Sequence, residues 1–86
     1  MNTTIMFREA IEQIPNDVRI EIDLSFAIAD KIDAILKQKG MTQKELARKM
    51  GKTEAEVSRW VGGTHNFTLR TIAKISDVLG EKILTV

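Results

Sequence analysis

Four side chains between residues 54 and 61 could contact the edges of nucleic-acid bases if this segment is a helix that enters a groove of DNA. Arg59 offers two parallel donors that match guanine O6 and N7, Ala55 can touch a thymine methyl group, and Glu54 can accept from cytosine N4. Ser58 falls on the same side of the helix. Other roles remain open, because Arg59 could instead bind phosphate or pair with a nearby acid, and Glu54 could simply favour the helix dipole.

The elements that must position these residues are predicted within residues 42–63, as two short helices. Thr42 precedes Glu45 by three residues, and Thr53 precedes Glu56 by three. Each threonine can cap the free amides of its helix while the glutamate bonds back, which is the pattern of a capping box. We therefore assign Glu56 to the cap and not to DNA.

A glycine separates these two predicted helices. Gly51 follows the apolar end of the first helix, where a left-handed residue is commonly needed to turn the chain. Ala47 is small enough to let the second helix pack closely, and Val57 and Trp60 are expected to face the core. The pattern predicts a helix, a tight turn and a second helix.

The segment 17–39 is ambiguous. Its first residues alternate between apolar and charged types, which is typical of a strand. The apolar ones are Val18, Ile20, Ile22 and Leu24. Over the whole segment, however, apolar residues recur every three or four positions on two stripes, which favours one long helix, either continuous or broken near residues 23–25. Two stripes need cover on two sides, either from a partner chain or from a helix predicted over residues 3–13.

The remaining elements are predicted from their boundaries. Pro15 ends the first helix, and Asn16 or Asp17 is expected to cap the next. A last helix begins at Thr68 and ends at Gly80. Its inward face is predicted as Leu69, Ile72, Ala73, Ser76 and Leu79. Residues 81–86 are apolar and β-branched enough for a short strand or docking arm, with packing back on the domain as the alternative.

Composition restricts the class of protein. With 86 residues, 43% of them apolar, the chain suits one small all-helical domain. We divide it into a helical extension over 1–24, a domain over 25–80 and an arm over 81–86. There is no cysteine and a single histidine, His65, so we expect no metal site, no cofactor and no enzyme. No segment resembles a membrane span or a secretory signal, which predicts a cytoplasmic protein.

Charge is distributed unevenly although the net charge is only +1. Residues 1–35 carry three bases and seven acids, whereas residues 36–76 carry nine bases and three acids. A basic middle between acidic flanks fits a local surface that binds a polyanion. A solvated basic face would give the same pattern.

The spacing of Gln43, Ala47, Gly51, Val57 and Trp60, with the two capping boxes, resembles the helix-turn-helix of the phage-repressor-like (Cro and cI type, XRE) family. The resemblance covers about residues 25–80. It implies a five-helix, lambda-repressor-like domain whose helix over residues 54–61 enters the major groove of double-stranded DNA. It also implies a homodimer on a palindromic operator and a role in transcription regulation.

Phosphate contacts are then expected around the rim of the groove. The candidates are Thr42, Gln43, Lys44, Lys52, Thr53, Thr64, His65 and Asn66. The resemblance supports Gln43 and the loop after the second helix. Lys44 and Lys52 could equally be ordinary solvent-facing lysines.

Residues 62–80, together with the small size and the N-terminal extension, are more loosely similar to antitoxins of the HigA kind. This similarity implies an antitoxin that binds a ribonuclease toxin and represses its own operon. One alternative is a stand-alone or phage-derived repressor. An alternative of another class is a helical protein-interaction module that does not bind DNA.

Overall fold

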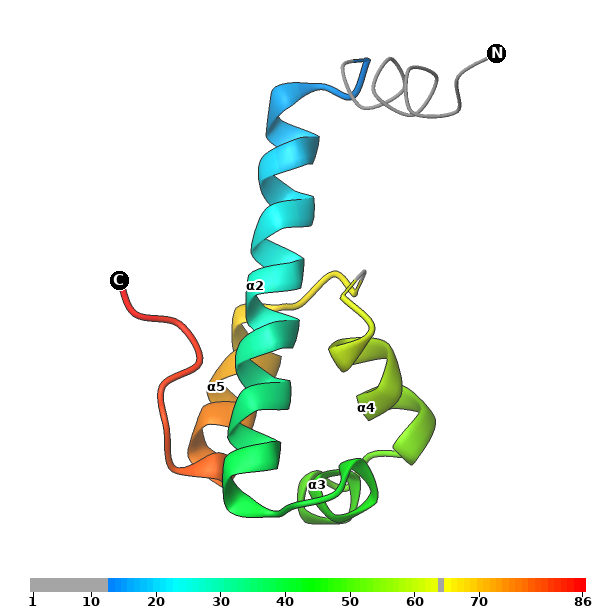
Figure 1. The fold of residues 1–86 in the computed structure, drawn as a ribbon, viewed down its shortest axis with the longest axis vertical. Coiled ribbons are helices and arrows are strands. Elements are labelled where there is room, and N and C mark those ends of the chain that lie inside the picture. The colour runs from blue at the N-terminus through cyan, green and yellow to red at the C-terminus, as the bar shows by residue number, and fades with distance from the viewer. Residues whose placement is uncertain (1–12, 64) are drawn as a thin grey trace.

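The computed structural model describes residues 13–63 and 65–86, and within them it contains four helices and no strand (Figure 1). The helices are α2 (Asn16–Lys39), α3 (Gln43–Met50), α4 (Glu54–Val61) and α5 (Leu69–Leu79). The all-helical prediction is confirmed for these residues. The helix predicted over 3–13 lies outside them apart from Gln13, so the expected count of five helices is not supported.

Helix α2 is continuous from Asn16 to Lys39, which decides against a strand over residues 18–24 and against a break near residues 23–25. Its N-cap is Pro15, whose carbonyl accepts from the Arg19 amide at 3.1 Å, and no side chain caps this end. The prediction that Asn16 or Asp17 caps the helix is therefore wrong. The φ of proline is compatible with a helix entry, and the helix starts one or two residues earlier than expected.

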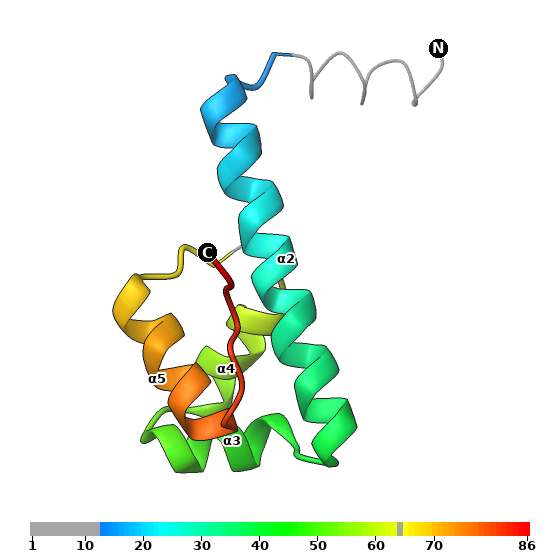
Figure 2. The same ribbon diagram turned by 90° about the vertical axis from the view of Figure 1, so that its left-hand side faces the viewer.

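The core lies where the carboxyl-terminal half of α2 meets the other three helices (Figures 1 and 2). Its fully buried larger side chains are Ile32, Ile35, Leu46, Val57 and Ile75. Burying each of these contributes about 1.5–3 kcal/mol relative to leaving it exposed. The amino-terminal half of α2 projects beyond this core, and the molecule is accordingly elongated, with extents of 47 × 28 × 21 Å.

Helix α5 packs through a face that differs from the predicted one. Ile72 and Leu79 are buried as expected, but Leu69 is 80% exposed and Ala73 is also exposed. Ile75, which the predicted face omitted, is fully buried. The inward stripe is therefore centred on positions 72, 75 and 79, and residues 69 and 73 fall outside it at 100° per residue.

The C-terminal residues form no strand, so the predicted short strand is corrected. The chain instead packs back on the domain, running beside α5 and α2 (Figure 2). Ile83 is buried in the core, and its amide donates to the Ser76 hydroxyl at 3.3 Å. The Glu81 amide donates to the Ser76 carbonyl at 3.2 Å. These bonds satisfy the backbone where a strand would have needed a neighbouring strand, which the described residues do not offer.

A close contact joins the end of α4 to α2. Gly63 has φ of 89°, and a Cβ added there would overlap the ring of Phe26. Only glycine combines this backbone conformation with so close an approach. The contact fixes how the chain leaves α4 relative to α2.

Among the described residues, none of the helices is both long and apolar enough to cross a bilayer.

Candidate nucleic-acid interface

Helix α3 begins at a threonine cap, as predicted. The Thr42 hydroxyl accepts from the Glu45 amide at 3.1 Å. The glutamate does not complete the box in the expected way, because its carboxylate accepts from the Thr42 hydroxyl at 3.2 Å instead of from the Thr42 amide. The cap still satisfies one free donor of the first turn, so α3 starts at a defined residue.

The turn after α3 is formed by Gly51 in the left-handed region, with φ of 66°. Its amide donates to the Arg48 carbonyl at 3.3 Å, and the next amide, that of Lys52, donates to the Ala47 carbonyl at 2.9 Å. This pair of bonds is the Schellman arrangement, which satisfies carbonyls at the end of α3. The predicted role of Gly51 is confirmed.

Helix α4 begins with a complete capping box, as predicted. The Glu56 amide donates to the Thr53 hydroxyl at 3.2 Å, and the Thr53 amide donates to the Glu56 carboxylate at 2.7 Å. The bond from the Thr53 amide is the main reason why the pKa of Glu56 lies below its ordinary value. Dehydration opposes it as the second-largest effect, and the Thr53 hydroxyl and the positive charges of Lys52 and Arg59 lower that pKa further. The carboxylate that the sequence assigned to the cap is therefore held there in its charged form.

The inward face of α4 is apolar and buried. Val57 is fully buried and Trp60 is 4% exposed, so the predicted core role of both residues is confirmed. The four candidate base-reading residues are exposed and share the opposite side of the helix. They are Glu54, Ala55, Ser58 and Arg59. All four side chains are therefore on the solvent side of the helix, where a groove of DNA could meet them.

A hydrogen bond between the two helices was not predicted. The Ser58 hydroxyl donates to Oε1 of Gln43 at 2.7 Å. It joins a candidate base-reading residue on α4 to a candidate phosphate-binding residue at the start of α3. Both side chains are polar and 15 positions apart, so no local sequence pattern could have paired them. The bond leaves the Gln43 amide donors available at the rim of the interface.

A basic groove lies between the starts of α3 and α4. Lys44 and Lys52 line it together, with Glu54 at the same groove. Arg48 also lines it, although the sequence analysis did not single out this residue. The only signal for Arg48 was its membership of the basic middle segment. The three bases outnumber the two acids of the groove, Glu45 and Glu54. A surplus of positive charge suits a phosphate backbone.

The loop after α4 carries the remaining phosphate candidates. Thr64 lies outside the described residues. His65 is half-buried, and its ring lies 4.9 Å from the Phe67 ring centre in an edge-on arrangement and 6.4 Å from that of Trp60. Asn66 lines grooves beside α2, together with Glu21. The assignment of these residues to phosphate stays a prediction.

Metal-ligating residues do not gather in the described part of the chain. No group of three or more His, Cys, Asp or Glu side chains there is placed to hold a metal ion. The chemistry that the described surface offers at α3 and α4 is hydrogen bonding and positive charge, which is the chemistry of polyanion and base recognition.

Two capped helices joined by a glycine turn, with the second presenting a polar outer face, define a helix-turn-helix protein. A family model described as helix-turn-helix matches residues 32–85, well over half of the chain. The chain belongs to this family, of the phage-repressor-like XRE type, and it is a DNA-binding regulator. Comparison with curated proteins and with solved structures found no match.

Proposed function

We propose that the protein is a transcriptional repressor that binds a palindromic operator as a homodimer, with α4 in the major groove. The observation that carries the proposal is the division of α4 into two faces. Val57 and Trp60 are buried, so the residues opposite them are exposed and carry donor, acceptor and methyl groups that suit base edges.

Each exposed residue of α4 has a distinct role in the proposal. Arg59 donates two parallel hydrogen bonds to guanine, Ala55 contacts a thymine methyl group, and Glu54 accepts from cytosine. Ser58 contributes through its bond to Gln43, which holds the amide of Gln43 toward the DNA backbone. Because a bidentate arginine contact discriminates most strongly among these, Arg59 makes the largest contribution to sequence preference.

Phosphate binding supplies affinity that does not depend on sequence. Lys44, Arg48 and Lys52 line one groove and are proposed to hold one stretch of backbone. The caps Thr42 and Thr53, and the loop residues 64–66, complete the proposed phosphate set.

A homodimer matches the two-fold symmetry of a palindrome. Two copies of α4 would enter successive major grooves, which are about 34 Å apart along the DNA. The narrower proposal that the protein is an autoregulating antitoxin rests on the similarity of residues 62–80 to the HigA kind. Co-purification with a small ribonuclease encoded beside its gene would support this role, and a gene with no such neighbour would count against it.

The direct test of the proposal is footprinting on the DNA upstream of the protein's own gene, followed by a titration against random DNA at the same salt concentration. We expect protection of two half-sites one helical turn apart, and binding at least about 10³-fold tighter than to random DNA. Equal affinity for both DNAs would contradict a sequence-specific repressor.

Replacing Lys52 tests the phosphate contacts. Lys52→Ala should weaken binding to operator and random DNA alike and should reduce the slope of log K against log salt by about one unit. Lys82→Ala is the matched control, since Lys82 is exposed, follows α5 and does not line the groove at α3 and α4. An unchanged slope for Lys52→Ala would remove this residue from the interface.

A further inference from the structure

Large exposed apolar side chains are concentrated on the amino-terminal half of α2. Of the eight that the structure shows among the described residues, five lie within nine consecutive positions. They are Val18, Ile20, Ile22, Leu24 and Phe26, with exposed fractions between 38% and 53%. At 100° per residue they form two stripes, with Val18, Ile22 and Phe26 on one side of α2 and Ile20 and Leu24 on the other. Apolar residues scattered singly over a surface are ordinary, but exposed apolar stripes of this kind mark interaction sites.

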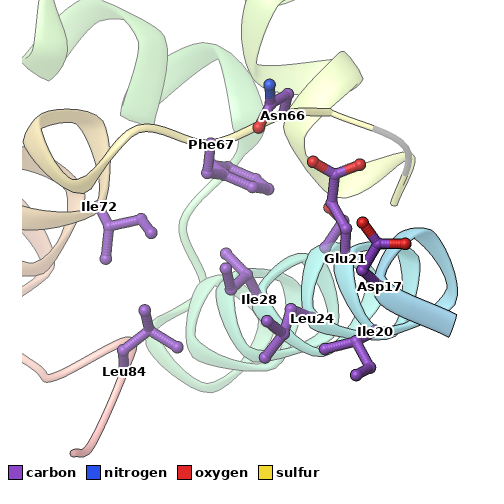
Figure 3. A pocket seen from close by; sticks show the side chains of 10 residues that line it. Asp17, Ile20, Glu21, Leu24, Ile28, Asn66, Phe67, Ile72 and Leu84 are labelled. Atoms are coloured by element: carbon purple, nitrogen blue, oxygen red, sulfur yellow. The ribbon is translucent and has the colours of Figure 1, made fainter.

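Part of this group forms one wall of an apolar groove of about 340 Å³ (Figure 3). Ile20 and Leu24 line it from α2, and Ile28 lies deeper on the same helix. Phe67, Ile72 and Leu84 line it from the loop before α5, from α5 and from the C-terminal segment. The groove therefore joins four parts of the chain into one surface.

Two charges of opposite sign lie along α2 on either side of Leu24: Asp17 lines the groove, and Lys31 lies beyond its lining. Asp17, Leu24 and Lys31 are spaced seven residues apart, so they follow one line along α2. All three are exposed. An acid thus stands at one end of the line, a base at the other, and an apolar residue midway between them.

We propose that this groove is the homodimer interface, in which the α2 helices of two copies lie antiparallel about a two-fold axis at Leu24. This inference rests on the homodimer of the proposed function and specifies how its subunits meet.

The antiparallel arrangement follows from the charges. About an axis at Leu24, Asp17 of each copy faces Lys31 of the other, and the two Leu24 side chains face each other. A parallel arrangement would instead place Asp17 against Asp17 and Lys31 against Lys31. A two-fold interface must be complementary to itself, and only the antiparallel register satisfies this requirement along the line.

The size of the surface is consistent with a second copy. A stable interface uses roughly 20–30 residues on each side, more than the exposed half of α2 provides. The loop before α5 and the C-terminal residues adjoin the groove and extend it. The C-terminal segment and α4 lie on opposite sides of α2 (Figure 1), so a copy seated on the groove leaves the outer face of α4 open.

Charge reversal tests the register. Asp17→Lys and Lys31→Asp should each weaken the dimer on the order of tenfold, because each change replaces two attractive pairs by two repulsive ones. The double variant should return to within about threefold of the wild-type dissociation constant. Asp30→Lys, a reversal on an exposed position of α2 away from the line, is the matched control and should change little.

The measurement is sedimentation equilibrium without DNA, with helix content checked by circular dichroism. The single reversals should approach wild type at high salt, where exposed charges are screened. Asp17→Lys also places a base in the first turn of α2, which the helix dipole disfavours. Lys31→Asp does not repair that local effect, so recovery in the double variant identifies contact between copies.

Crosslinking provides a second measurement that does not depend on charge. The chain has no cysteine, so Leu24→Cys introduces a single thiol at the proposed axis. We expect it to form a disulfide-linked dimer on mild oxidation at micromolar concentration, whereas the control Asp30→Cys should remain largely unlinked.

The outcomes separate this inference from the proposed function. A wild-type protein that is monomeric at every concentration tested, and on the operator, would contradict the homodimer itself. A wild-type dimer that neither responds to charge reversal nor crosslinks through Leu24→Cys would overturn the interface and leave the homodimer standing. In that case the groove is not the surface through which the two copies meet.

Discussion

Two regions of the molecule differ in how completely their helix ends are capped and their apolar side chains are buried. One is the corner formed by α3 and α4, and the other is the amino-terminal half of α2. At the corner, both helices start at threonine caps, a glycine closes the turn, and the apolar side of α4 is buried. On α2, the first helical turn has no side-chain cap, and Ile20 and Leu24 are about half exposed. The corner is stabilised by contacts within its own sequence, whereas this half of α2 leaves apolar side chains exposed.

The largest expected effect is on the free energy of unfolding, to which the two regions should contribute very differently. Trp60→Ala should destabilise the domain by about 3–5 kcal/mol, because it leaves a large cavity in the core. Leu24→Ala removes an exposed side chain and should change the stability of the isolated monomer by less than about 0.5 kcal/mol. Thermal and denaturant unfolding at low protein concentration measures both.

The same unfolding experiment shows whether the comparison is correct. If Leu24→Ala destabilised the dilute monomer as strongly as Trp60→Ala, the amino-terminal half of α2 would already be buried within one chain. At high concentration, Leu24→Ala should lower the unfolding temperature further, since dimerisation stabilises the folded state.

A smaller effect is expected where the two regions touch, at Gly63 and Phe26. Gly63→Ala should cost on the order of 1–3 kcal/mol, because φ is positive there and the new methyl group overlaps the Phe26 ring. In a variant that also carries Phe26→Ala, Gly63→Ala should cost less stability, because the overlap with the ring is gone and only the backbone strain remains. Gly51→Ala is the control for backbone strain alone, since its Cβ would meet nothing within 4 Å. Equal losses at both glycines would mean that the ring contact has no effect.

The smallest effect concerns the capping box and depends on pH. Because the pKa of Glu56 is lowered in the folded protein, the unfolded chain binds a proton more readily than the folded one. The contribution of Glu56 is therefore complete above the ordinary glutamate pKa and is lost as the pH falls through the lowered value. Glu56→Gln should flatten the fall in stability in this acidic range. Glu54→Gln, on the same helix without a cap bond, should leave it unchanged, and an unaltered profile for Glu56→Gln would exclude the box as the cause.

Local chemistry explains which features could be predicted. The cap at Thr53, the turn at Gly51 and the burial of Trp60 each depend on residues within a few positions of one another, so the sequence pattern was sufficient. The start of α2 was missed because Pro15 itself provides the helix entry. The Thr-x-x-Glu pattern also allows two hydrogen bonds to the glutamate carboxylate, one from the threonine hydroxyl, as at Thr42, and one from its amide, as at Thr53.

Tertiary contacts explain what could not be predicted. The bond between Ser58 and Gln43 joins residues 15 positions apart, and the contact of Gly63 with Phe26 joins two helices. Ile75 is buried because of where α5 docks, which no propensity specifies. The C-terminal residues have strand-like composition, yet the described chain offers them no strand to pair with, so they pack through Ile83.

The most direct test of the central claim, that the outer face of α4 reads bases, is the affinity of Arg59 variants for operator and random DNA at one salt concentration. Arg59→Ala should lose about 1–3 kcal/mol on the operator and relax the preference at one base pair. Arg59→Lys keeps the charge but not the two parallel donors, so it should keep the affinity for random DNA and still lose the preference. Equal loss on both DNAs for Arg59→Ala, with full recovery in Arg59→Lys, would assign Arg59 to phosphate and contradict the account.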